Sequence, residues 1–162
     1  MTSEQTQNVK IYTDGSSRGN PGPGGYGAIL LCGPHRKELA QGFKHTTNNR
    51  MELLGVIEAL KALKRPCKVD LYSDSQYVVQ AIEKKWLENW KRKNWKTSNK
   101  KNVKNVDLWL KLNELLNTHK ITFHWVRGHN GHPENERCDV MAVAAATQGP
   151  LIEDHGFTPE TD

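Results

Sequence analysis

Apolar and polar residues alternate at the start of the chain, and this pattern predicts three consecutive strands. A period of two over Val9–Asp14 is typical of a strand, and a turn rich in glycine and proline follows at Gly15–Gly25. A second run at Tyr26–Cys32 and a third at about 37–45 have the same character. Because the strands follow one another closely in sequence, we expect an antiparallel meander.

The remainder of the chain has mostly the three- and four-residue spacing of amphipathic helices. Residues that cap helices, or Pro133 in the last case, precede each apolar run. The pattern predicts helices at about 48–64, 75–84, 105–117 and 133–147, and strands at 67–73 and 121–126. The order βββ-α-β-α-α-β-α predicts an α/β (mixed α+β) fold, in which helices flank a five-stranded mixed sheet. We expect one domain over residues 1–147 and a flexible tail over 148–162.

The composition is that of one soluble globular domain. Its 162 residues are 36% hydrophobic and 25% charged, and no apolar run approaches the roughly 20 residues needed to cross a bilayer. The N-terminus has neither the basic start nor the apolar core of a signal peptide. Cys32, Cys67 and Cys138 lack metal-binding spacing and predict free thiols in a reducing compartment. We therefore expect a cytoplasmic protein without membrane contact, and a monomer because no apolar stripe is left unassigned.

Positive charge is concentrated in one segment. Residues 84–104 contain nine lysines and arginines and a single acid, Glu88, although the net charge of the whole chain is only +5. Three tryptophans, Trp86, Trp90 and Trp95, lie between these cations. Tryptophan faces can pack on sugars or bases while cations neutralise phosphates, so the segment is typical of a grip on a polyanion. The alternative is that the tryptophans belong to the core.

Four carboxylates lie near the ends of predicted elements. Asp14 and Asp74 end strands, Glu52 lies in the first turn of a helix, and Asp139 lies on the last helix. Mg²⁺ prefers such oxygen ligands beside a substrate phosphate, and two ions about 3.5–4 Å apart can stabilise both reacting oxygens of a phosphoryl displacement. Each acid alone has a simpler explanation as a turn, cap or solvated residue, but together they predict a magnesium site.

Polar neighbours of these acids suggest what the site would bind. Asn48 and Asn49 share one helical face with Glu52, so their amides could hydrogen-bond sugar or base edges. The alternative is an ordinary helix cap with a carboxylate placed favourably at the N-terminus. His129 lies in a loop among glycines, where it is either surface decoration or a group that moves protons near neutral pH.

With these residues assembled, the chain resembles the bacterial type 1 ribonuclease H family, over about residues 9–147. The matching motifs are Thr13–Ser16, Gly19–Ala28, Thr46–Leu53, Ser73–Val78, Val103–Trp109 and Gly128–Asp139. The resemblance implies a ribonuclease H-like fold and hydrolysis of the RNA strand of RNA–DNA hybrids. It also implies two Mg²⁺ ions, with Mn²⁺ as a substitute, and products with 5′-phosphate and 3′-hydroxyl ends.

The resemblance also implies roles for individual residues. The metal-binding acids are Asp14, Glu52, Asp74 and Asp139, and His129 is the mobile loop histidine that assists proton transfer or product release. Contacts to the RNA strand are implied for Ser17, Asn20, Asn48, Asn49 and Gln76. A DNA-phosphate pocket is implied for Thr47 and Asn20. The basic protrusion that grips the DNA strand is implied for Trp86, Asn89, Trp90, Lys91, Arg92 and Lys93.

Two departures from the family pattern and two rival functions accompany this resemblance. The segment Glu83–Lys85 looks one residue longer than usual, which rotates the subsequent residues by roughly 100° unless a bulge absorbs it. Asn130 stands where a small apolar residue is more usual.

One rival function is that of a junction resolvase or transposase-like nuclease, against which the amides of Asn48, Asn49 and Gln76 argue. The other is a silent hybrid-binding module, which has no use for four carboxylates.

Overall fold

The computed structural model describes residues 7–96, 103–127 and 132–157, and it contains a six-stranded mixed sheet. The strand order is β5-β4-β1-β2-β3-β6. The strands are β1 (Gln7–Ser17), β2 (Gly22–Cys32), β3 (His35–Thr46), β4 (Cys67–Ser73), β5 (Lys120–Trp125) and β6 (Leu151–Ile152). The antiparallel pairing of β1, β2 and β3 and the mixed α/β class are confirmed, whereas the expected count of five strands is corrected to six.

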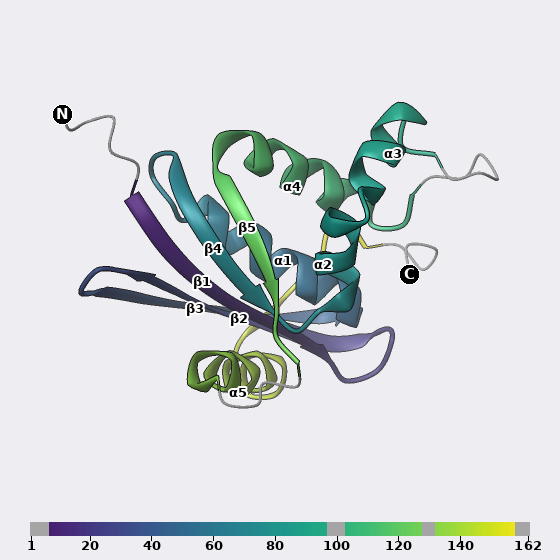
Figure 1. Cartoon of the computed structure of the whole chain (residues 1–162). Coiled ribbons are helices and arrows are strands. Elements are labelled where there is room, and N and C mark those ends of the chain that lie inside the picture. Colours follow the sequence, from purple (N-terminus) through teal and green to yellow (C-terminus); the bar gives the residue numbers. More distant parts are fainter. Residues whose placement is uncertain (1–6, 97–102, 128–131, 158–162) are drawn as a thin grey trace.

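Helices cover both faces of this sheet (Figure 1). They are α1 (Asn48–Lys61), α2 (Gln76–Glu83), α3 (Trp86–Arg92), α4 (Val106–Thr118) and α5 (Pro133–Thr147). On one face α1 packs on β1 and β2 and is backed by α4, and on the other face α5 packs on β1, β2 and β3. Within the described ranges, none of the helices has the length and apolarity to pass through a membrane.

The main core lies between the sheet and α1. Residues of β1 that point to this face, Val9 and Ile11, meet apolar side chains of α1 such as Met51 and Ile57, and Trp109 of α4 closes the layer. Each fully buried side chain of this size contributes roughly 1.5–3 kcal/mol relative to exposure. The central position of β1 and α1 is therefore fixed by apolar burial, and both elements carry predicted site residues.

The basic segment contains a helix that the sequence pattern does not predict as a separate element. Lys84 ends α2 and Lys85 takes the left-handed conformation at φ 59°, so α3 starts again in a new direction. The break falls within Glu83–Lys85, the segment that looks one residue longer than the family pattern. The ring centroids of Trp90 and Trp109 lie 5.3 Å apart, and those of Trp86 and Trp90 lie 6.3 Å apart. Tryptophan packing thus anchors α3 to α4, and α3 stands away from the sheet (Figure 1).

A buried ion-pair network ties α1 to two distant segments. The Arg50 side chain is 0% exposed, and its Nε donates to Asp154 Oδ2 at 2.7 Å while Nη2 donates to Asp107 Oδ2 at 2.8 Å. The Thr46 hydroxyl also donates to Asp154, at 2.7 Å. Burial alone would lower the pKa of Arg50, but the hydrogen bonds to Asp107 and Asp154 raise it above its ordinary value. Arg50 therefore stays charged in the interior.

The segment after α5 contributes both β6 and Asp154. Leu151 and Ile152 pair in parallel with Gly42 and Phe43 of β3. The sequence predicts a flexible tail from residue 148 onward, yet the described part of that tail adds a strand and an ion pair to the domain. A two-residue strand has no periodicity to detect, which is why the pattern of hydrophobic residues does not reveal it.

Replacing Asp154 by alanine should lower the free energy of unfolding by about 3 kcal/mol, because it leaves part of a buried guanidinium without its partner. Urea unfolding followed by circular dichroism measures this difference. Glu153→Ala is the matched control, since it removes a carboxylate from the adjacent exposed position. Equal unfolding midpoints for the two variants would contradict a structural role for the ion pair.

Candidate active site

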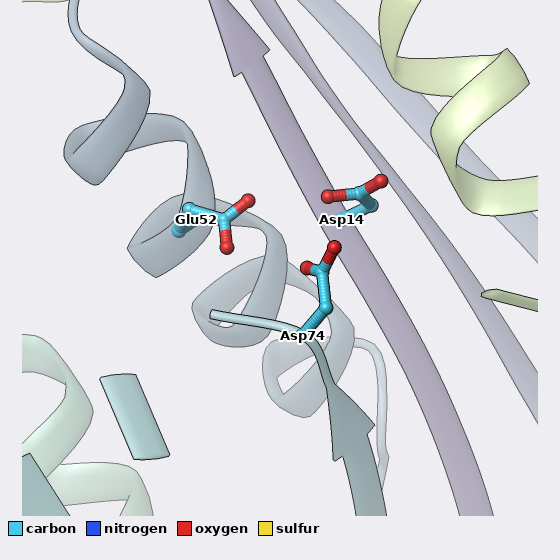
Figure 2. Close-up of side chains that lie close together, drawn as sticks. All are labelled: Asp14, Glu52 and Asp74. Atoms are coloured by element: carbon cyan, nitrogen blue, oxygen red, sulfur yellow. The ribbon is translucent and has the colours of Figure 1, made fainter. Parts of the chain in front are cut away.

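Three carboxylates meet at one edge of the sheet. Strands β1 and β4 are parallel, with Thr13 in register with Ser73, so the next residues Asp14 and Asp74 emerge side by side. Glu52 reaches them from the first turns of α1. One oxygen atom from each of Asp14, Glu52 and Asp74 lies within 4.8 Å of the others. Figure 2 shows the three side chains pointing toward one another from β1, α1 and the end of β4.

Gly15 holds two of these carboxylates in place. Its backbone N–H donates to Asp14 Oδ1 at 2.8 Å and to Glu52 Oε1 at 2.7 Å. A Cβ atom at this position would lie 2.5 Å from the backbone nitrogen of Glu52 and 2.5 Å from the carbonyl carbon of Met51. Only glycine lets β1 approach α1 this closely. The close approach of strand and helix brings the acids together.

The electrostatics of the cluster are unfavourable without a cation. Burial raises the pKa of Glu52 well above its ordinary value, and the charges of Asp14 and Asp74 raise it further. Hydrogen bonds from the Ser75 hydroxyl and the Gly15 N–H act in the opposite direction but do not cancel the rise. A divalent cation would offset this repulsion, and a set of carboxylate oxygens is the donor set that Mg²⁺ prefers. The residues present therefore fit a magnesium site.

A cavity of about 440 Å³ opens over the acids. Asp139 of α5 lines this cavity, but it lies outside the group of carboxylates that share the 4.8 Å spacing. The side chains of Asn48, Asn49 and Gln76 line the wall beside the acids. All four predicted acids and three of the predicted RNA contacts thus face one cavity.

The turn between β1 and β2 is tied to the first turn of α1. Asn20 Oδ1 accepts hydrogen bonds from the Asn48 N–H at 2.9 Å and from the Ser17 hydroxyl at 3.2 Å. Thr47 caps α1 by accepting from the Arg50 N–H at 3.3 Å, and it is nearly fully buried. The structure brings Ser17, Asn20 and Asn48 into direct contact, with Thr47 adjacent to them in the chain.

The predicted contacts in the basic segment lie on α3 and beside it, apart from the residues that line the acidic cavity. Lys91, Arg92 and Lys93 are exposed, and the Arg92 guanidinium donates to Asn89 Oδ1. Trp86 and Trp90 are half-buried because they pack on the core. The predicted histidine, His129, falls outside the described residues.

Three residues inside the matching motifs have roles in the site that the sequence analysis does not predict. Arg50 occupies a buried position on α1, Gly15 fixes the acid pair, and Ser75 both caps α2 and hydrogen-bonds Glu52. The sequence does contain a signal for a buried Arg50. It is a charged residue in the apolar face of a predicted helix, and Asp107, in the first turn of another helix, is an acidic residue that could pair with it. No local pattern indicates that Ser75 contacts Glu52, since α1 and α2 are far apart in sequence.

A mixed sheet with carboxylates clustered beside its parallel strands β1 and β4 defines an α/β protein that can hold divalent cations next to a phosphate. The model of the RNase H family matches residues 6–147. The ribonuclease H of Nitratidesulfovibrio vulgaris (strain DSM 19637 / Miyazaki F) is 61% identical over 93% of this chain and 97% of its own length. The ribonuclease H of Klebsiella pneumoniae is 57% identical over 94% and 97%. The chain belongs to the RNase H family and is a nuclease.

Solved structures agree with this assignment. The crystal structure of LC9-RNase H1, a type 1 RNase H with the type 2 active-site motif, is 32% identical and matches with a TM-score of 0.79 over 93% of this chain and 79% of that one. The N-terminal RNase H domain of Rv2228c from Mycobacterium tuberculosis is 28% identical, with a TM-score of 0.67 over 87% and 94%. The expected family and fold are thereby confirmed.

In metal-free solution the stability of the protein should fall as the pH rises above about 4.5. Because the folded-state pKa of Glu52 is raised, the folded protein holds a proton that the unfolded chain releases. The limiting slope for one proton is ~1.4 kcal/mol per pH unit, and it ends once the pH exceeds the folded-state pKa. Glu52→Gln should flatten this fall and exceed the wild type in stability at pH 8.

Urea unfolding in EDTA at pH values from 5 to 8 measures this effect. Glu58→Gln is the control, because Glu58 lies on the same helix but outside the acidic cluster. If Glu52→Gln kept the wild-type dependence on pH, the raised pKa of Glu52 would be refuted.

Proposed function

We propose that this chain hydrolyses the RNA strand of RNA–DNA hybrids and leaves 5′-phosphate and 3′-hydroxyl ends. Membership of the RNase H family supports this substrate class. The observation that carries the proposal is the cluster of Asp14, Glu52 and Asp74, whose oxygens lie within 4.8 Å of one another under an open cavity. A cluster of this charge is costly unless it serves to bind cations next to a phosphate.

In the proposed mechanism the four acids hold two Mg²⁺ ions, for which Mn²⁺ can substitute. Asp14 would contribute to holding both ions, Glu52 and Asp74 would hold the ion at the scissile phosphate, and Asp139 would hold the other. When bound, the ions stabilise the attacking and the leaving oxygen of the displacement. Asp74 orients the attacking water, and His129 moves a proton or assists product release.

The amides that line the cavity support an RNA strand as the substrate. Hybrid duplexes are close to A-form, and their shallow minor groove presents the 2′-hydroxyl groups that distinguish RNA from DNA. Asn48, Asn49 and Gln76 stand beside the acids and can donate to and accept from such hydroxyls. The crystal structure of LC11-RNase H1, whose fold this chain shares, contains an RNA/DNA hybrid. The proposed RNA contacts also include Ser17 and Asn20.

The proposal also covers the DNA strand of the hybrid, the oligomeric state and the cellular compartment. Thr47 and Asn20 form a pocket for a DNA phosphate, and the exposed cations on and after α3 grip the DNA strand. The protein acts as a monomer in the cytoplasm. The thiols of Cys32, Cys67 and Cys138 are free in the structure, which is compatible with a reducing compartment.

Asp14→Asn should abolish cleavage while hybrid binding in Ca²⁺ remains, because the variant loses the shared carboxylate but keeps the groups that bind substrate. A gel assay with one end-labelled RNA strand measures this, with the RNA presented alone, paired with RNA and paired with DNA. The wild type should cut only the hybrid, and only in Mg²⁺ or Mn²⁺, not in EDTA. Asp70→Asn, a change at an acid outside the cluster, is the control and should cut normally.

The two rival functions give different results in the same assay. Cleavage of an added DNA duplex would favour a resolvase-like nuclease, and tight hybrid binding without any cleavage would favour a silent binding module. Mg²⁺-dependent activity that persisted in Asp14→Asn would refute the proposed mechanism.

Neutralising Lys91, Arg92 and Lys93 to glutamine should weaken hybrid binding and reduce its dependence on salt. Removing one cation that binds a phosphate should lower the slope of log affinity against log salt by about one. Fluorescence anisotropy in Ca²⁺ at 50–200 mM salt measures the slope. A triple change of Lys64, Lys68 and Lys120, exposed cations away from α3, is the charge-matched control. An unchanged slope would exclude the basic segment as the grip.

A further inference from the structure

A third strand ends at the same edge as the two strands that carry Asp14 and Asp74. Strand β5 runs parallel to β4, and Trp125 is in register with Ser73. The Val126 N–H donates to the Ser73 carbonyl at 2.9 Å, which extends the pairing one residue further. In open α/β sheets, ligands bind outside the carboxyl ends of such parallel strands. The end of β5 therefore lies beside the end of β4, which Asp74 follows directly (Figure 1).

Trp125 is exposed at this edge in a way that packing does not explain. Its exposure is 41%, whereas Trp109 is fully buried and Trp86, Trp90 and Trp95 pack against the core. Among the tryptophans, all of which fall within the described residues, Trp125 alone is in the exposed class. A large indole left open on the strand next to the one that leads to Asp74 has the properties of a contact surface for sugars or bases.

The partner of Trp125 is a cation. The guanidinium carbon of Arg127 lies 5.0 Å from the centroid of the Trp125 ring. Arg36 and Arg137 both pair with Glu38, and Arg50 is neutralised in its buried network. Over the ranges that the structure describes, Arg127 has no such carboxylate partner. Its charge is held in place by the indole but is not neutralised.

The contact with Trp125 does not occupy the hydrogen-bonding groups of Arg127 with a carboxylate. A guanidinium whose carbon lies over an indole ring can still use its N–H donors to bind a phosphate with two parallel hydrogen bonds. Fixing the side chain on the indole also reduces the conformational entropy lost on binding. A positive charge here would offset the repulsion between the incoming phosphates and the nearby carboxylates.

We propose that Arg127, held by Trp125, binds a backbone phosphate of the RNA–DNA hybrid beside the acidic cavity. This inference rests on the proposed function, because it assigns a further substrate contact at the same site. Arg127 binds substrate, and Trp125 acts as a positioning residue that also packs on the adjoining sugar. The pair governs affinity and leaves the chemical step to the acids.

Arg127→Gln tests the inference against Lys120→Gln, which removes the same charge from the opposite end of β5, roughly 20 Å away. Fluorescence anisotropy with a hybrid in Ca²⁺ should show about tenfold weaker binding for Arg127→Gln and a salt slope lower by about one. Lys120→Gln should match the wild type in both quantities. In Mg²⁺, Arg127→Gln should raise KM and leave kcat unchanged.

Two variants of Trp125 separate positioning from folding. Trp125→Phe keeps an aromatic face and should retain most of the affinity for the hybrid, while Trp125→Ala should bind the hybrid nearly as weakly as Arg127→Gln does. Thermal unfolding checks that each variant is folded. If Trp125→Ala does not fold, Trp125→Phe is compared with the wild type instead.

The results distinguish this inference from the proposed function. The inference is overturned if the wild type cleaves hybrids while Arg127→Gln and Lys120→Gln bind them with equal affinity and with equal slopes of log affinity against log salt. In that case Arg127 does not bind phosphate. A fall in kcat without a change in KM would also overturn it. If the wild type neither binds nor cleaves hybrids, the proposed function itself fails.

Discussion

Repulsion among three carboxylates at one end of the sheet is the constraint that the rest of the structure has to satisfy. Asp14, Glu52 and Asp74 come from three separate elements, and without a cation their charges oppose the packing that brings them together. The cluster persists because apolar burial between β1 and α1 supplies the stability, and because glycine at position 15 permits the close approach of the two backbones. Apolar burial in one part of the sheet–helix interface thus offsets the repulsion among carboxylates in another part, as is common for functional sites.

Helix α1 carries an unfavourable charge interaction on one side and a favourable one on the other. On one side Glu52 faces the acidic cluster, and on the other Arg50 is neutralised by Asp107 and Asp154. Asn20 holds the backbone of the first turn from a third direction. The residues proposed to read the substrate therefore lie on a turn whose position is fixed by segments distant in sequence. Such support is what a site needs if its side chains are to be placed to within a fraction of an ångström.

Sequence periodicity predicts the helices and strands that bury apolar side chains, but it does not predict those that bury few. The meander and helices α1, α4 and α5 have clear periods, so their type and order follow from the pattern. The end of β4 at Ser73 is also predicted from the sequence, and Asp74 follows it directly, whereas β1 continues to Ser17, three residues beyond its predicted end at Asp14. Contacts between distant segments carry no local signal. The separate helix α3 depends on a left-handed residue at Lys85, and the exposed pair of Trp125 and Arg127 becomes visible only when β5 is placed beside β4.

The short strand β6 has a consequence for how the chain avoids self-association. Strand β3 would otherwise form an open border of the sheet, with backbone donors and acceptors free to recruit a strand from another molecule. Leu151 and Ile152 occupy part of that border at Gly42 and Phe43. Because these residues are made after the rest of the sheet, a growing chain exposes the border until translation has passed them. The pairing of β6 therefore shortens the part of β3 that another strand can join, and it can do so only after the rest of the sheet has been made.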